Sequence, residues 1–148
     1  MLRKTLATLC ATSLLNVAVM AHADAQRTFA SESGTVTATP VVEGLVHPWA
    51  LAFLPEKQGM LVTELPGNLR VVSPSGKLSA PLSGVPQVWA KGQGGLLDVV
   101  LSPSFVEDRL VYLSYAEGGG EDGKAGTTVG RGRLSDDLTK LSNFEVIF

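Results

Sequence analysis

The sequence predicts an all-β protein built from consecutive β-propeller blades. Short apolar and β-branched segments recur along the chain, separated by turns rich in glycine, proline and serine, and no stretch has a convincing helical period. Two similar groups of strands begin with segments that end at Pro55 and at Pro103. A repeat of about 50 residues with four strands in each unit is typical of a propeller blade.

Residues 1–23 have the three-part form of a secretory signal peptide. Two basic residues precede an apolar stretch over residues 6–20, and Ala21-His22-Ala23 supplies small residues at the cleavage-determining positions. We expect cleavage after Ala23, with Ala25 as the second choice, and export to the periplasm. The apolar stretch is too short to favour a membrane span, so no stable membrane anchor is expected.

The composition excludes several functional classes. The single cysteine, Cys10, lies inside the predicted signal, and Leu9 before it is not the small residue of a lipoprotein signal. A lipid anchor and disulfides in the mature chain are therefore not expected. Removal of residues 1–23 leaves 10 basic and 14 acidic residues, a net charge of −4. Since no basic patch stands out, nucleic acid is not expected as a partner.

The first blade is expected to begin at Gly44, after a leader over residues 24–43 that is polar at first and includes a possible first strand. The four strands of this blade are predicted at residues 49–54, 60–64, 69–72 and 77–82. The first of them is apolar without alternation and stops at Pro55, as expected of the innermost strand, which packs between neighbouring blades.

The second blade is expected to repeat this order, with strands at residues 96–101, 110–115, 127–134 and 143–148. A glycine-rich insertion over residues 118–126 delays its third strand, and Asp136-Asp137 makes a solvent-facing turn. We expect the strand over residues 96–101 to be buried on both faces. Because propellers close with about four to eight blades, two blades cannot close a ring, and the chain is expected to be the front part of a longer protein.

A glycine-rich loop, Lys91-Gly92-Gln93-Gly94-Gly95, leads into the second inner strand. Glycines allow backbone angles that are closed to other residues, so the loop can turn sharply and point Gln93 at a ligand. The amide of glutamine both donates and accepts hydrogen bonds, as recognition of a sugar hydroxyl requires. The alternative is a common glycine turn whose glutamine only satisfies the backbone.

Other polar residues are weaker candidates. His47 stands at the mouth of the first inner strand, where it either lines the channel or is a structural loop residue. Asp98 interrupts an apolar strand and must be paired or face water, and we expect a structural role. Glu64 is expected to face solvent. Trp49 and Trp89 either stack on a sugar or pack in the core, which is the commoner use. No metal ligands are assigned, since the glycine-rich insertion lacks the spaced acidic residues of a calcium loop.

Five runs of residues, in order and at blade spacing, resemble a known family: the soluble, periplasmic PQQ-dependent aldose sugar dehydrogenases, relatives of soluble quinoprotein glucose dehydrogenase in the glucose/sorbosone dehydrogenase group. The resemblance covers the chain from about Gly44 to its end. The runs are HPWALAFLP (47–55), GMLVTE (59–64), KGQGGLLDVVLSP (91–103), RLVYLSY (109–115) and GRLSDDL (132–138).

The resemblance implies a six-bladed propeller, with residues 44–148 as its N-terminal part of about two blades. It implies pyrroloquinoline quinone (PQQ) and calcium bound over the central channel. The implied reaction oxidises the C1 hydroxyl of an aldose to a lactone and passes electrons to an acceptor. Gln93 matches the glutamine of the family's sugar-contacting motif, so the resemblance assigns substrate binding to Gln93.

The other functional residues of the family are expected in later blades. Its catalytic histidine lies in the third blade, and neither His22 nor His47 matches the motif around it. No catalytic residue, quinone contact or calcium ligand is therefore assigned in this chain, which is expected to be inactive alone. The alternative hypothesis is that the protein is a non-catalytic periplasmic propeller that binds a ligand or protein partner. The fold alone does not distinguish this binding module from the dehydrogenase.

Overall fold

The computed structural model describes residues 26–118 and 123–148, and the chain divides into two units, residues 1–39 and 40–148. The predicted signal peptide lies outside the described residues. In the first unit, β1 (Arg27–Ser31) and β2 (Gly34–Ala38) form an antiparallel hairpin whose residues are all exposed. Residues 27–31, expected in an irregular leader, are therefore a strand. Their backbone pairs with β2 across a turn closed by Gly34 (φ 124°), and such pairing does not require apolar side chains.

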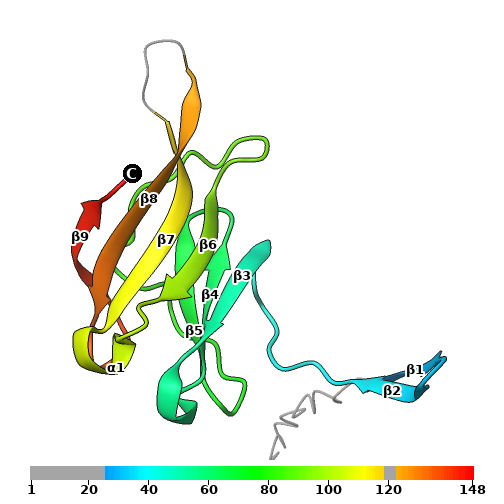
Figure 1. The fold of residues 1–148 in the computed structure, drawn as a ribbon. Coiled ribbons are helices and arrows are strands. Elements are labelled where there is room, and N and C mark those ends of the chain that lie inside the picture. Colours follow the sequence, from blue (N-terminus) through cyan, green and yellow to red (C-terminus); the bar gives the residue numbers. More distant parts are fainter. Residues whose placement is uncertain (1–25, 119–122) are drawn as a thin grey trace, which may run out of the picture. The chain divides into compact units, whose positions relative to one another are not determined.

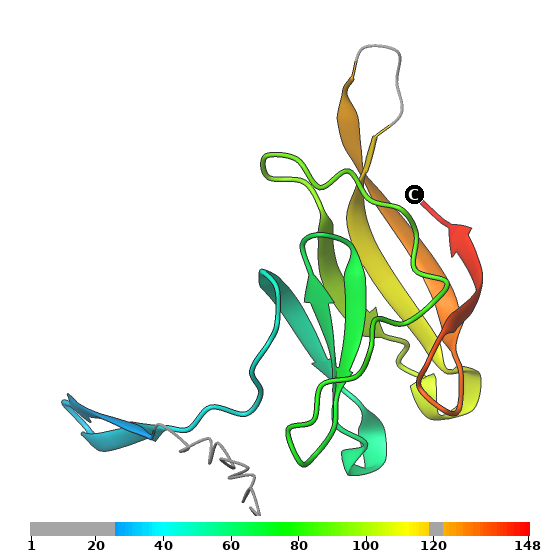
Figure 2. The ribbon, with the colours of Figure 1, turned by 180° about the vertical axis from the view of Figure 1, so that it is seen from behind.

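Two antiparallel sheets make up the second unit, and each follows the order of the sequence (Figure 1, and from behind in Figure 2). The first sheet consists of β3 (Pro48–Phe53), β4 (Met60–Glu64) and β5 (Asn68–Val72). The second consists of β6 (Leu96–Leu101), β7 (Leu110–Gly118), β8 (Ala125–Leu134) and β9 (Leu141–Val146). Two short helical turns, η1 (Pro55–Lys57) and α1 (Phe105–Asp108), follow the two inner strands β3 and β6.

The predicted fourth strand of the first blade, over residues 77–82, is irregular. It runs beside β5, where the N–H groups of Ser79 and Leu82 donate to the carbonyls of Val71 (2.8 Å) and Leu69 (2.9 Å). A regular ladder does not form, because the Ser79 hydroxyl takes the N–H of Val71 (2.9 Å) and Pro81 has no N–H to donate. The prediction of a strand over residues 77–82 is therefore wrong, although the segment does lie beside β5.

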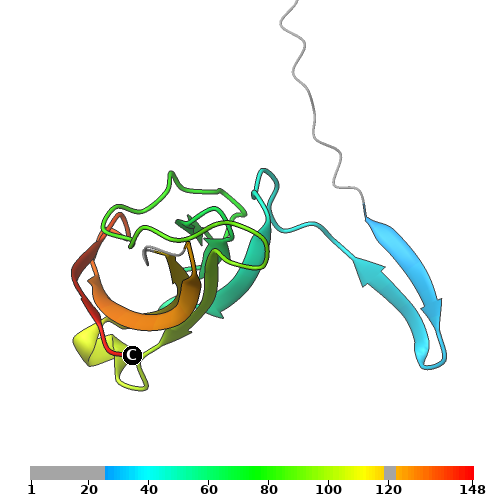
Figure 3. The ribbon, with the colours of Figure 1, turned by 90° about the horizontal axis from the view of Figure 1, so that it is seen from above.

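The core lies between the two sheets, where β3 runs beside β6 (Figure 3). The first sheet presents small residues from β3, Ala50 and Ala52, and larger ones from β4 and β5. The second sheet presents Leu96 and Val99 of β6 and Val111, Leu113 and Tyr115 of β7. The prediction that residues 96–101 are buried on both faces is wrong for the described chain. Val100 is 55% exposed, since a sheet covers only one side of β6.

Both inner strands carry a one-residue bulge at the same position of the repeat. The pairing of β3 with β4 shifts between Pro48 and Leu51, and the pairing of β6 with β7 shifts between Leu96 and Val99. The bulge of β6 follows the bulge of β3 at the same interval that separates Pro103 from Pro55. The interval between the two prolines therefore also gives the equivalent residue of β6 for each residue of β3.

A side-chain hydroxyl from the neighbouring strand occupies each bulge. The N–H of Ala50 donates to Thr63 Oγ1 (3.0 Å), and the N–H of Asp98 donates to Ser114 Oγ (3.0 Å). Bulges leave a residue of the ladder unpaired, and the hydroxyl supplies the missing partner. Asp98 itself is exposed, and its Oδ1 accepts the N–H of Val99 (2.9 Å), which agrees with the predicted structural role.

No helix in the described part of the chain has the length and apolar character needed to cross a membrane.

Candidate functional site

The two inner strands begin at the same end of the sheets, and the loops that precede them meet there. His47 comes before β3, Leu65 and Pro66 follow β4, and the glycine-rich loop comes before β6. Together they surround an open hollow of about 330 Å³, lined by His47, Leu65, Pro66, Ala90, Gly92 and Gly94. The structure therefore brings His47 and the loop that carries Gln93 to one end of the fold, as the sequence analysis expected.

The backbone of the glycine-rich loop is held by local contacts. The N–H of Gly94 donates to the carbonyl of Lys91 (3.0 Å), which closes a turn with Gly92 at φ 61°. Gly95 has φ 145°, and a Cβ at this position would collide with the carbonyl oxygen of Leu65. A side chain is excluded there by both conformation and space. The backbone conformation and the close packing of this loop therefore explain why glycine stands at these positions, without any role in ligand binding.

Gln93 differs from the glycines around it. Its side chain is exposed and forms no hydrogen bond to any residue of the described ranges 26–118 and 123–148. A glutamine that served only to satisfy the backbone would form a side-chain hydrogen bond with a neighbouring N–H or carbonyl group. The turn fixes the Gln93 backbone between Gly92 and Gly94, which line the hollow, but Gln93 itself is not among the lining residues. Its amide is left available, with two donors and one acceptor, for a ligand.

His47 adopts a backbone conformation that is unusual for a residue with a side chain, with φ 47°. Two contacts hold this segment: the carbonyl of His47 accepts the N–H of Leu65 (3.0 Å), and the N–H of Val46 donates to Glu64 Oε1 (2.8 Å). The imidazole is exposed at the hollow. Strain of this kind persists only where surrounding contacts determine it, and it occurs often at functional sites.

The prediction that Glu64 faces solvent is wrong, because the residue is fully buried. Its carboxylate accepts from the N–H of Val46 and from Asn68 Nδ2 (2.9 Å), and Arg70 Nη1 lies 3.5 Å from Oε2. These partners compensate the desolvation of the charge. Glu64 positions the segment before His47, a role that the sequence analysis missed. The available signal was Asn68 and Arg70 on the strand that returns from the turn, since the register pairs Glu64 with Asn68.

Neither tryptophan lines the hollow. Trp89 packs on β7, where a Cβ on Gly118 would collide with the indole ring, and Lys91 Nζ lies 4.5 Å from the ring centroid. Trp49 is 54% exposed and lines an apolar groove on the outer face of the first sheet instead. Trp89 therefore has the packing role that is commoner for tryptophan. Trp49 lies too far from the hollow to be one of its lining residues.

Within the described ranges, no three His, Cys, Asp or Glu side chains are grouped closely enough to hold a metal ion. His47 is the one ionisable residue among the described residues that line the hollow. Calcium requires several oxygen ligands and a quinone carboxylate requires cationic partners. The described residues do not fit either group, and no reaction step through them follows from this part of the fold.

Comparison with known proteins decides the family. Residues 45–148 match the model of the family described as Glucose / Sorbosone dehydrogenase. The chain belongs to this family. The glucose/sorbosone dehydrogenase match begins just before β3 and includes both sheets, the hollow and the loop of Gln93. The resemblance stated from the five sequence runs is thereby confirmed.

Relatives with similar sequences are known in two bacteria. The chain is 59% identical over 114 residues to the aldose sugar dehydrogenase YliI of Escherichia coli K12, which covers 77% of this chain and 30% of the relative. It is 38% identical over 121 residues to the uncharacterized protein slr1608 of Synechocystis, covering 76% and 28%. The chain thus spans less than a third of the length of these relatives.

Solved structures agree on the fold. The apo-form of the soluble aldose sugar dehydrogenase from Escherichia coli matches with a TM-score of 0.68 and 62% identity, covering 70% of this chain and 30% of that one. The PQQ-bound form of the aldose sugar dehydrogenase from Streptomyces coelicolor matches with a TM-score of 0.58 and 25% identity, covering 73% and 31%. The fold prediction is confirmed: the described chain is nearly all β, with antiparallel sheets like the propeller blades of these dehydrogenases.

Proposed function

We propose that this chain is part of a periplasmic dehydrogenase that oxidises the C1 hydroxyl of an aldose to a lactone and passes the electrons to an acceptor. The 59% identity to an aldose sugar dehydrogenase and the PQQ-bound structure of a second relative support this proposal. PQQ, assisted by calcium as a Lewis acid, supplies the acceptor for the C1 hydride when it is bound. The non-catalytic binding module is not favoured by any of these comparisons.

The observation that carries the proposal is the exposed, unbonded amide of Gln93, which stands in the chain between Gly92 and Gly94, two residues that line the hollow. In the proposed complex this amide accepts a hydrogen bond from one sugar hydroxyl and donates to another near C1. The closed turn of Lys91 to Gly94 fixes the backbone of Gln93, so that only the side-chain rotamers have to be ordered when a sugar binds. Gln93 therefore acts as a substrate-positioning contact.

The surrounding residues shape the site without taking part in proton transfer. Glu64 holds the segment before His47 through the N–H of Val46, and His47 lines the hollow together with Gly92 and Gly94 of the glycine-rich loop. The base that takes the C1 hydroxyl proton is expected outside this chain, as the family resemblance implies. The isolated chain is accordingly expected to be inactive.

A chimera tests the proposal. Residues 45–148 of this chain replace the matching segment of the Escherichia coli aldose sugar dehydrogenase, and the protein is loaded with PQQ and calcium. We expect aldose-dependent reduction of a redox dye well above a control without sugar. A folded chimera that binds PQQ but does not reduce the dye would contradict the assignment. Aldose-dependent activity of the isolated chain would contradict the expected place of the base.

A further inference from the structure

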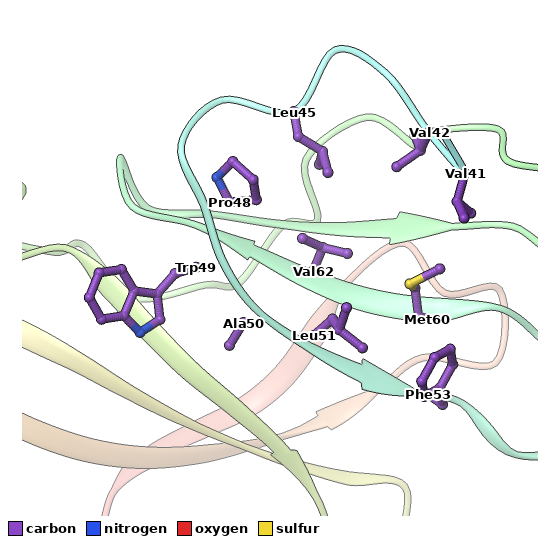
Figure 4. A pocket seen from close by; sticks show the side chains of 10 residues that line it. All are labelled: Val41, Val42, Leu45, Pro48, Trp49, Ala50, Leu51, Phe53, Met60 and Val62. Carbon is purple, nitrogen blue, oxygen red and sulfur yellow. The ribbon is translucent and has the colours of Figure 1, made fainter. Parts of the chain in front are cut away.

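His47 lines the hollow, while its neighbours in the chain line a different surface. Leu45, Pro48 and Trp49 line the apolar groove of the first sheet, together with other residues of β3 and β4 (Figure 4). Of residues 45–49, only His47 lines the hollow, and it is also the only one of them with a positive φ. The left-handed conformation at His47 therefore coincides with the change from one surface to the other.

The backbone of His47 departs from two conformational preferences at once. A φ of 47° is uncommon for a residue with a side chain, and the residue before a proline usually has an extended backbone with negative φ. A glycine would meet the conformational need at lower cost, so the presence of an imidazole at this position needs a separate explanation. Strained conformations of this kind are often found at binding sites, where surrounding contacts impose them.

Leu65 connects His47 to the glycine-rich loop. The N–H of Leu65 donates to the carbonyl of His47 (3.0 Å), and the carbonyl of Leu65 accepts the N–H of Leu96 (3.1 Å) at the start of β6. Gly95 of the loop packs against the same carbonyl, because a Cβ on Gly95 would collide with its oxygen. One residue thus holds the backbone on both sides of the hollow, and the two sides keep a fixed separation.

The imidazole of His47 is exposed and forms no hydrogen bond or ion pair within the described ranges 26–118 and 123–148. A neutral imidazole has one N–H donor and one acceptor nitrogen, as the hydroxyl groups of a sugar require. The hollow, of about 330 Å³, has a volume in the range of small-molecule sites. Its other lining residues are apolar residues and glycines: Leu65, Pro66, Ala90, Gly92 and Gly94. Among the described residues that line the hollow, His47 therefore has the side chain that can hydrogen-bond a sugar.

We propose that His47 is a second substrate contact of this site, and that its imidazole binds an aldose hydroxyl other than the one at C1. The inference rests on the proposed function, in which Gln93 contacts the hydroxyls near C1 and the imidazole is left with hydroxyls farther along the ring. A contact of this kind is made equally in the ground state and in the transition state. It therefore acts mainly on KM and on the choice among aldoses.

The PQQ-loaded chimera is the protein in which to test this contact. His47→Gly removes the imidazole and is compatible with the backbone conformation. We expect it to raise KM for D-glucose roughly three- to tenfold, the effect of one hydrogen bond, with kcat and PQQ affinity little changed. Circular dichroism establishes that each variant is folded. If the glycine variant is unfolded, His47→Asn, which tolerates positive φ and has a shorter side chain, takes its place.

Lys57→Gly is the matched control for the change in backbone freedom. Lys57 is exposed, has φ 58° and belongs to η1, which follows β3 at the end away from His47. This control is expected to leave KM unchanged. If Lys57→Gly raises KM as much as His47→Gly does, the proposal is overturned, because the effect then comes from the backbone.

Deoxy sugars separate a direct contact from a structural effect. We compare KM of the unsubstituted chimera and of His47→Gly for 2-, 3-, 4- and 6-deoxy-D-glucose. Where the missing hydroxyl is a partner of the imidazole, the difference between the two proteins is expected to shrink or vanish, and for the other sugars it is expected to persist. An equal increase of KM for every sugar, or no increase for any, overturns the proposal.

Titration calorimetry of D-glucose on the same proteins distinguishes failure of this inference from failure of the proposed function. Oxidation and binding that do not respond to His47→Gly overturn the inference and leave the proposed function intact. Weaker binding by His47→Gly, in a chimera that does not oxidise the sugar, contradicts the proposed function and supports His47 as a sugar contact. A chimera that neither binds nor oxidises D-glucose overturns both.

Discussion

The Thr63 hydroxyl, carried by β4 of the first sheet, donates a hydrogen bond of 2.6 Å to the Leu97 carbonyl at the bulge of β6. The same oxygen accepts the N–H of Ala50 at the bulge of β3 (3.0 Å). Because Thr63 is fully buried, no water competes for these partners. One hydroxyl thus joins the irregular points of both inner strands, close to the end where the loop of Gln93 begins.

Replacement of Thr63 by valine tests this connection. Valine keeps the volume but removes the hydroxyl, so the N–H of Ala50 and the carbonyl of Leu97 lose their partner. We expect the free energy of unfolding to fall by about 1–3 kcal/mol, measured by urea denaturation at a fixed protein concentration. Thr63→Ser, which keeps the hydroxyl, is expected to lose clearly less. Equal stability of the valine variant and the unsubstituted chain would contradict the assigned role.

Two glycines of β8 provide a matched pair of packing variants. A Cβ on Gly130 would lie 2.5 Å from Cζ of Phe144, whereas a Cβ on Gly126 would meet no atom within 4 Å. Gly130→Ala is therefore expected to displace the Phe144 ring and to cost about 1–3 kcal/mol of stability. Gly126→Ala is expected to be nearly neutral in thermal unfolding. If the two alanine variants melt alike, the packing of Phe144 on β8 is not as described.

Asp108 makes the stability depend on pH. Its Oδ1 accepts the N–H of Leu110 (2.9 Å) and its Oδ2 accepts the Ser102 hydroxyl (2.6 Å). These hydrogen bonds, the first being the larger effect, hold the pKa of Asp108 below its ordinary value of 3.8. A carboxyl group with a lowered pKa in the folded state stabilises the fold above its unfolded pKa, and this contribution is lost as the pH falls toward the folded pKa.

We therefore compare the melting temperatures of the unsubstituted chain and Asp108→Asn during acidification from about pH 5 to pH 3. The unsubstituted chain is expected to lose more stability over this interval, because the asparagine cannot be protonated. Ser102→Ala removes one of the two hydrogen bonds and is expected to give an intermediate slope. Parallel curves for all three proteins would show that Asp108 does not contribute.

The role of Gln93 is tested in the active chimera. If the amide binds the sugar near C1, Gln93→Ala lowers kcat/KM by roughly ten- to hundredfold, about 1.4–2.7 kcal/mol of transition-state stabilisation. PQQ affinity is expected to change little, since the cofactor contacts are assigned to other blades. Gln58→Ala, at the opposite end of the sheets beside η1, is the matched control and is expected to keep full activity. If Gln93→Ala keeps full activity but lowers the stability, the glutamine has only a structural role in the turn and does not bind the sugar.

Export is tested by the N-terminus of the mature protein. Arg3 and Lys4, the apolar stretch after them and Ala21-His22-Ala23 predict cleavage after Ala23 or Ala25. N-terminal sequencing of the protein recovered from the periplasm is expected to begin at Asp24 or Gln26. Recovery of a membrane-bound product with Met1 intact would refute the predicted signal peptide.

The sequence alone determined most of the strands and turns, because strand periodicity and turn chemistry are local properties of the chain. Residues 96–101 were predicted as a strand and form β6, and the turn at Asp136-Asp137 is solvent-facing as predicted, with the Asp136 side chain 91% exposed. The position of the Gln93 loop at the mouth of β6 followed from its glycines. The repeat marked by Pro55 and Pro103 and the family resemblance likewise needed no tertiary contact.

The tertiary structure decided which of these residues are buried and what they contact. Glu64 holds the segment before His47 through Val46, which is 18 residues away along the chain, and Thr63 and Leu97 are 34 residues apart. Contacts over such separations depend on how the strands stack, which no local pattern encodes. Burial of β6 on one face only has the same origin. Apolar side chains in the sequence indicate that a strand is favoured in the core, but the neighbouring sheet determines which of its faces is buried.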